Sequence, residues 1–99
     1  MKSGYRILWT DNAINELEQT IDFLKLNWTN KEIEQLIKAL NQTADLISIN
    51  PRLFPVSYKS KVRKAVVDSL NTIYFRENEN SIEILSFFSN RQHPSKRKI

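Results

Sequence analysis

The sequence predicts an α+β domain in which a helical hairpin packs on one face of a small antiparallel sheet, in the order β-α-α-β-β-β. Residues 11–49 carry apolar side chains at intervals of three and four, which is the period of amphipathic helices. After residue 60, short runs rich in valine, isoleucine and aromatic residues alternate with turn-forming clusters, as is typical of strands. A length of 99 residues fits one domain spanning 1–99.

The first strand is expected at residues 5–9 and the first helix at 11–28. The run Tyr-Arg-Ile-Leu-Trp is rich in the aromatic and β-branched residues that favour strands. Thr10 or Asp11 then offers a side-chain oxygen that can cap the helix. The apolar stripe of this helix has spacings of four, three and four, and it consists of Leu17, Ile21, Leu24 and Trp28.

A second helix follows after only one or two residues, so the two helices must fold back on each other. Thr29 and Glu32 match the capping-box pattern Thr-x-x-Glu. Asn50-Pro51 ends the helix, because proline lacks the amide hydrogen that the helix needs. The apolar stripe consists of Ile33, Leu36, Ile37, Leu40, Ala44 and Ile47. Four glutamates of the two helices are expected to be solvated: Glu16, Glu18, Glu32 and Glu34.

The second half of the chain predicts a loop and then a three-stranded meander. The loop spans residues 51–60, with Leu53 and Phe54 placed against the core. The strands are expected at about 61–67, 72–76 and 81–88. The links between them are short, and short links join only antiparallel strands. The helices then cover one face of the sheet, because nothing else can bury their stripes, and the opposite face stays open.

Positive charge is concentrated in the C-terminal half. The chain has a net charge of +4, with −2 in residues 1–50 and +6 in residues 51–99, where a basic tail of about 89–99 ends the sequence. Such a surface favours phosphate backbones or acidic protein segments as partners. The alternative is that a modest positive charge only keeps a small domain soluble.

Several classes of site are excluded by composition. The chain has no cysteine, so it has neither disulfides nor thiolate metal sites. It also lacks a glycine-rich phosphate loop, metal-ligand spacing and a nucleophile motif, and no metal or cofactor is expected. The N-terminus leads into no long apolar stretch, so we expect neither a signal peptide nor a membrane span, and a cytoplasmic location.

The cations are expected to gather on the open side of the sheet. Lys61 and Arg63 should alternate onto one side of a strand, with Val62 and Val66 on the other. The end of the last strand can return near them and bring the tail cations to the same side. The candidate partner-binding residues are Lys59, Lys61, Arg63, Lys64, Tyr74, Arg91, Lys96 and Arg97. The alternative is a solvated strand whose lysines protect a sheet edge.

Two further residue types could carry chemistry. His93 is the only histidine and could act as a general acid or base, although an exposed tail position is the simpler interpretation. Tyr74 and Tyr58 could stack on a base or donate a proton, although Tyr74 could equally serve cross-strand packing.

The chain resembles the RelE/ParE family of toxins along nearly its whole length. The N-terminal part of the resemblance is Tyr5 to Thr10 with Ala13 and Leu17-Glu18, followed by Asn50-Pro51 and Phe54-Pro55. The C-terminal part is Val62-Arg63-Lys64, Val66-Val67, Ile73-Tyr74-Phe75, Ile82 to Leu85, and Arg91-Gln92-His93-Pro94. The resemblance implies the strand, helical hairpin and meander already expected. It also implies the toxin of a type II toxin–antitoxin module of the plasmid-stabilisation type, covered by a cognate antitoxin in a hetero-oligomer.

The family divides by target, and the resemblance leaves three readings open. ParE-like members bind and poison DNA gyrase, and the Arg-Gln-x-Pro ending looks closer to them. RelE-like members cut mRNA in the ribosome, and in that case Arg63, Arg91 and His93 would be the catalytic residues. RNA-cleaving members commonly carry a tyrosine near the C-terminus, whereas no tyrosine follows Tyr74 here. The third reading is an inactive descendant that only binds antitoxin.

Overall fold

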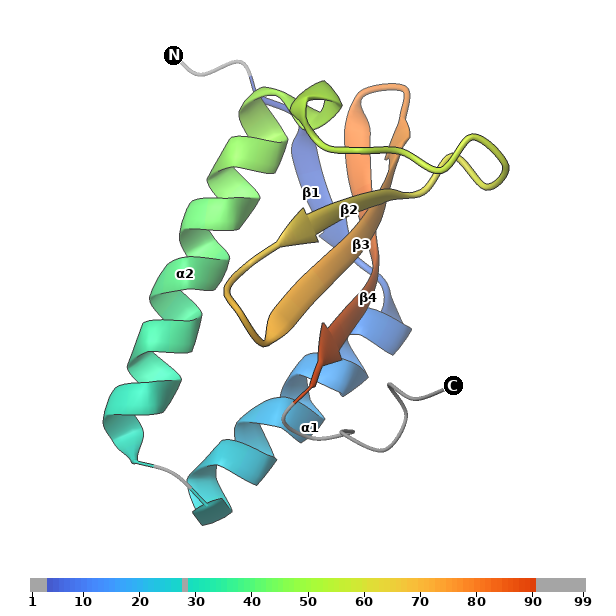
Figure 1. Ribbon diagram of the computed structural model, residues 1–99. Helices are drawn as coiled ribbons and strands as arrows, with labels where there is room; N and C mark the ends of the chain where they lie inside the picture. Colours follow the sequence, from blue (N-terminus) through green and yellow to red (C-terminus); the bar gives the residue numbers. More distant parts are fainter. Residues whose placement is uncertain (1–3, 28, 91–99) are drawn as a thin grey trace.

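The computed structural model describes residues 4–27 and 29–90 (Figure 1). The elements are β1 (Arg6–Trp9), α1 (Asp11–Asn27), α2 (Asn30–Ile49), the short 3-10 helix η1 (Pro51–Leu53), β2 (Arg63–Val66), β3 (Asn71–Asn78) and β4 (Ser81–Ser89). The predicted α+β class and element order are confirmed. The observed β2 is shorter than expected, whereas β3 and β4 are longer.

The four strands form one sheet in the order β1-β4-β3-β2. The meander β2-β3-β4 is antiparallel as expected. Strand β1 lies at the edge beside β4 and runs parallel to it, with Arg6 opposite Ser81 and Trp9 opposite Ile84. The sheet is therefore mixed rather than wholly antiparallel. This parallel pair is possible because the two helices and the meander supply the long connection that parallel neighbours require.

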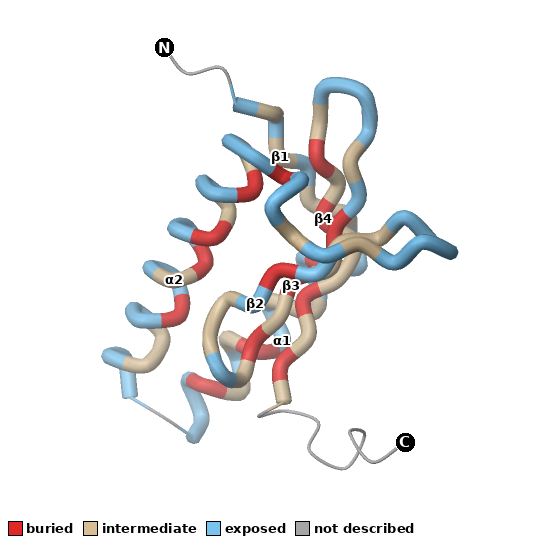
Figure 2. The backbone as a smooth tube through the Cα atoms, turned by 45° about the horizontal axis from the view of Figure 1, so that its top comes forward, coloured by how far each residue is buried: buried red, intermediate tan, exposed pale blue. Residues whose placement is uncertain are grey.

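Both helices pack on the same face of the sheet and enclose one hydrophobic core. Figure 2 shows that the buried residues, in red, lie along the parts of the helices and strands that face one another. The core consists of Ala13 and Leu24 from α1, Leu36, Leu40 and Ile47 from α2, and Ala65, Ile73, Phe75, Ile82, Ile84 and Phe87 from the sheet. Trp9 is partly buried and packs against this core.

The helices meet at their connection and spread apart over the sheet (Figures 1 and 2). The predicted apolar stripes are largely confirmed, although Ile37 is exposed. The predicted capping box does not form. The Thr29 side chain makes no capping hydrogen bond, and the Glu32 amide donates to the Thr29 carbonyl oxygen at 3.1 Å instead. Trp28 lies outside the described residues.

A β-bulge in β4 is bound by the start of α1. The register shifts between Tyr74, which faces Ser86, and Phe75, which faces Ile84. Glu16 of α1 accepts hydrogen bonds from the Ser86 hydroxyl at 2.8 Å and from the Phe87 amide at 2.9 Å. The expectation that Glu16 is a solvated charge is therefore wrong. Its carboxylate satisfies the Ser86 hydroxyl and the Phe87 amide, which lies beyond the end of the β1–β4 pairing at Ile84.

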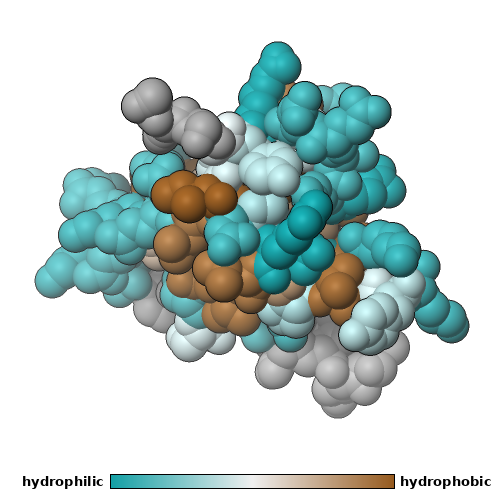
Figure 3. Space-filling model, turned by 90° about the horizontal axis from the view of Figure 1, so that it is seen from above, coloured by the Kyte–Doolittle hydropathy of each residue, from teal (hydrophilic) through white to brown (hydrophobic). Residues whose placement is uncertain are grey.

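The segment after α2 crosses the end of the sheet. The Phe54 ring meets the Phe75 ring edge to face, with 5.7 Å between ring centroids, so the expected contact of Phe54 with the core is confirmed. Leu53 is 69% exposed, and the expectation that it packs on the core is wrong. Leu46 and Ile49, near the end of α2, are also exposed. Figure 3 shows a group of hydrophobic side chains on the face of the molecule seen from above.

Core packing gives a direct stability test. Replacing Phe75 with alanine should leave a cavity and lower the free energy of unfolding by about 3–5 kcal/mol. Urea denaturation followed by circular dichroism measures this loss. Leu53→Ala is the matched control, because an exposed side chain should change the stability by less than about 0.5 kcal/mol. A similar loss in both variants would contradict the placement of Leu53.

Candidate interaction site on the open sheet face

The face of the sheet opposite the helices is centred on Tyr74. Alternate side chains of a strand point to opposite faces, and Ile73 and Phe75 face the core, so Tyr74 faces away from the helices. Tyr74 stands between Lys64 of β2 and Ser86 of β4. This row places an aromatic ring beside an exposed cation, whereas the Ser86 hydroxyl is already bonded to Glu16. The row can therefore contact both apolar and anionic groups of a partner.

The open face is apolar at one end and charged beyond Tyr74. Towards the end of β2 it carries Val66, which is 61% exposed, and Phe88. Beyond Tyr74, Arg76 donates to the Glu83 carboxylate at 2.8 Å in a cross-strand ion pair. Arg76 is therefore a neutralised charge rather than a free cation.

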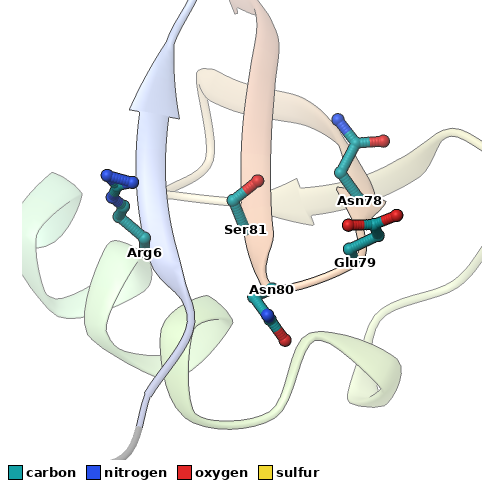
Figure 4. Close-up of a pocket in the computed structure, with 5 residues that line it drawn as sticks. All are labelled: Arg6, Asn78, Glu79, Asn80 and Ser81. Atoms are coloured by element: carbon teal, nitrogen blue, oxygen red, sulfur yellow. The ribbon is translucent and has the colours of Figure 1, made fainter.

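A polar hollow ends the open face at the β3–β4 turn (Figure 4). It has a volume of about 450 Å³ and is lined by Arg6, Asn78, Glu79, Asn80 and Ser81. Arg6 comes from β1 and lies beside Ser81 of β4, whereas Glu79 projects from the turn (Figure 4). The carboxylate reduces the attraction of this hollow for anions, and we assign it no ligand.

Arg63 does not lie on the open face, which corrects the predicted gathering of cations. It belongs to the same side of β2 as Ala65, which is fully buried, and it stands opposite Phe75. One guanidinium nitrogen donates to the Phe54 carbonyl oxygen at 2.7 Å. Arg63 therefore binds the segment that crosses the sheet, while its neighbour Lys64 takes the open side.

The other predicted cations are divided between the loop and the tail. Lys59 and Lys61 are exposed in the loop before β2, as is Tyr58. Lys61 has a φ of 63° and so lies outside the regular strand, but it lines one hollow together with Arg63, beside Glu77 and Glu79. Four predicted site residues lie outside the described part of the chain: Arg91, His93, Lys96 and Arg97.

A second charged cluster joins Tyr5, just before β1, with η1 and β3, near Arg63. Arg52 forms an ion pair with Glu77 at 3.3 Å, and the Tyr5 hydroxyl donates to the same carboxylate at 2.9 Å. The hydrogen bond from Arg52, aided by that from Tyr5, lowers the pKa of Glu77. The bond to Glu77 also raises the pKa of Tyr5, because it favours the protonated hydroxyl. The sequence analysis missed this cluster, because its members are far apart along the chain.

Residues 4–27 and 29–90 contain neither a metal-binding cluster nor a membrane-spanning helix. No group of three or more histidine, cysteine, aspartate or glutamate side chains there could hold a metal ion. In the same part of the chain, no helix is long and apolar enough to cross a bilayer.

Comparison with known proteins identifies the family. Residues 7–94 match the profile of the ParE toxin of the type II toxin–antitoxin system parDE. The chain belongs to the ParE toxin family. The resemblance to RelE/ParE toxins is thereby confirmed, and membership implies a cognate antitoxin as partner. No curated protein matches the sequence.

A solved structure supports the ParE fold independently. The chain is similar to a chain of the chromosomal ParDE toxin–antitoxin system from P. aeruginosa, with a TM-score of 0.72 and 14% sequence identity. The match covers 89% of this chain and 98% of the other. At this identity the likeness shows the fold alone.

The Arg52–Glu77–Tyr5 cluster of this ParE family member should make stability depend on pH. The pKa of Glu77 is lower in the folded state, so its contribution is complete above the ordinary glutamate pKa of about 4.3 and is lost as the pH falls through the lowered pKa. We expect Glu77→Gln to lower the melting temperature at pH 7 and to make a smaller difference at about pH 3. Thermal denaturation across this range measures the effect. An equal loss for Glu77→Gln at both pH values would show that ionisation of Glu77 does not contribute.

Proposed function

We propose that this ParE family toxin stops bacterial growth by binding and poisoning DNA gyrase in the cytoplasm, and that its antitoxin covers the same surface. The match of residues 7–94 to the ParE toxin of parDE carries the proposal. Gyrase poisoning is the activity that the resemblance implies for this branch, and it requires binding rather than chemistry by the toxin.

The arrangement of the open face supports binding over RNA cleavage. Cleavage needs a base, an acid and cations gathered around one phosphate. Arg63, the cation assigned to this task within the described residues, lies on the opposite face from Tyr74 and is bound to Phe54. The open face instead presents Tyr74 beside Lys64, which suits recognition of a protein surface.

Induced expression in bacteria tests the proposed target. We expect filamentation and a DNA-damage response while translation continues, and purified protein should inhibit supercoiling by gyrase. Co-expression of the antitoxin should restore growth. Rapid arrest of translation with cuts in ribosome-bound mRNA would overturn the proposal in favour of a RelE-like nuclease. Normal growth with antitoxin binding retained would instead identify an inactive descendant.

His93 provides a separate test of chemistry. A toxin that only binds its target does not need the single histidine as an acid. We therefore expect His93→Ala to retain growth inhibition at matched protein levels, measured as colony counts after induction. Loss of inhibition in His93→Ala together with loss of mRNA cuts would contradict the binding mechanism.

A further inference from the structure

A groove on the open side of the sheet lies between the 55–62 loop and Tyr74. Its volume is about 480 Å³, and it is lined by Pro55, Val56, Ser57, Ser60, Val62, Lys64 and Tyr74. Most of the lining is apolar, and among residues 4–27 and 29–90 Lys64 is the one charged side chain in it. A groove of this kind accepts an apolar side chain and places an anion beside the lysine.

The backbone beside the groove forms a short strand edge. The Lys64 amide donates to the Pro55 carbonyl oxygen at 3.1 Å, and the Ser57 amide donates to the Val62 carbonyl oxygen at 2.9 Å. These two bonds flank the antiparallel bridge between Val56 and Arg63. In an antiparallel ladder a pair flanked in this way exchanges no hydrogen bonds itself. The N–H and C=O groups of Val56 therefore point away from β2, where they can pair with a partner's backbone.

The charge around the groove is positive. Lys64 lines the groove and Lys59 is exposed on the loop that borders it, whereas Lys61 lines a separate hollow with Arg63, Glu77 and Glu79. No carboxylate lines the groove, and neither ion pair of the described residues involves Lys59 or Lys64. Their charge is therefore available to a partner, and the complementary ligand is acidic.

We propose that this groove binds an extended acidic segment of a protein partner. The segment would pair with the backbone of Val56, place one apolar side chain over Val62 and Pro55, and bring a carboxylate to Lys64. A free strand edge, an apolar floor and a lysine together match the backbone, the side chain and the charge of such a segment. A nucleic acid fits less well, because an apolar floor offers nothing to a phosphate backbone.

The inference rests on the proposed function, since it names the kind of segment that a protein partner would present. Its test does not depend on toxicity. The purified protein is titrated with a capped synthetic peptide of about ten residues in which glutamate alternates with valine. The amide NMR spectrum of isotope-labelled protein reports which residues the peptide contacts. Parallel titrations use a peptide with lysine in place of glutamate and a short single-stranded oligonucleotide.

We expect the acidic peptide to shift the amide signals of residues 55–64 and of Tyr74, and the lysine peptide to shift none of them. Lys64→Glu should lower the affinity for the acidic peptide by about fivefold or more. Val62→Ser should also lower it, by removing apolar contact. Lys38→Glu is the matched control, because this substitution makes the same change of charge at an exposed position of α2, on the other side of the sheet. Its affinity should remain within about twofold of the wild type.

Three outcomes would overturn the inference. If the peptide causes no shifts at residues 55–64, the groove is not a peptide site. If Lys64→Glu and Lys38→Glu lower the peptide affinity equally, the attraction comes from net charge alone and not from the groove. Stronger binding of the oligonucleotide than of the acidic peptide would assign the groove to nucleic acid. If the groove binds the acidic peptide but the chain does not inhibit gyrase, the proposed function fails while the groove assignment stands.

Discussion

The hydrogen bonds between the start of α1 and the bulge of β4 determine which side of this protein is free to act. Ile84 and Leu85 direct carbonyl oxygens towards α1, where the Thr10 hydroxyl donates to Ile84 at 2.8 Å and the Asn12 amide donates to Leu85 at 3.0 Å. Glu16 accepts from the other side of the bulge. These contacts hold α1 against one face of the sheet. The second helix packs on the same face, because its connection to α1 is short. The opposite face, with Tyr74 at its centre, is left open as a consequence.

The bulge also explains how β4 keeps a single apolar face. Ile82 and Ile84 face the core, and strict alternation would next bury Ser86 and expose Phe87. The additional residue reverses the alternation, so that Phe87 is buried while Ser86 is only partly buried. A break in the apolar pattern at this point is the signal that the sequence contains. It could have predicted a bulge, although it could not have shown that Glu16 would bind there.

The sequence predicts the elements of this fold well and the faces of its edge strand poorly. Helical stripes and turn clusters are local signals, so element order and type could be read directly from them. Which side chains of β2 point towards the core depends on tertiary packing, which is not a local signal. We expected the valines at positions 62 and 66 to face the side away from Arg63, which is correct, but the side they occupy is the open one. Ala65 is buried instead, because the face beneath α2 accepts a small side chain there, and Arg63 shares that face.

Within residues 51–90, the arginines and the lysines at positions 59, 61 and 64 differ in how they are bonded. Each arginine in that range is bonded within the protein: Arg52 to Glu77, Arg63 to the Phe54 carbonyl and Arg76 to Glu83. Guanidinium groups suit this task, because their planar donors bind oxygen atoms in fixed directions. The lysines at positions 59, 61 and 64 enter no ion pair of the described residues. Loss of toxicity in an Arg63 variant would therefore mix damage to the fold with loss of charge, whereas Lys64 reports on charge at the open face alone.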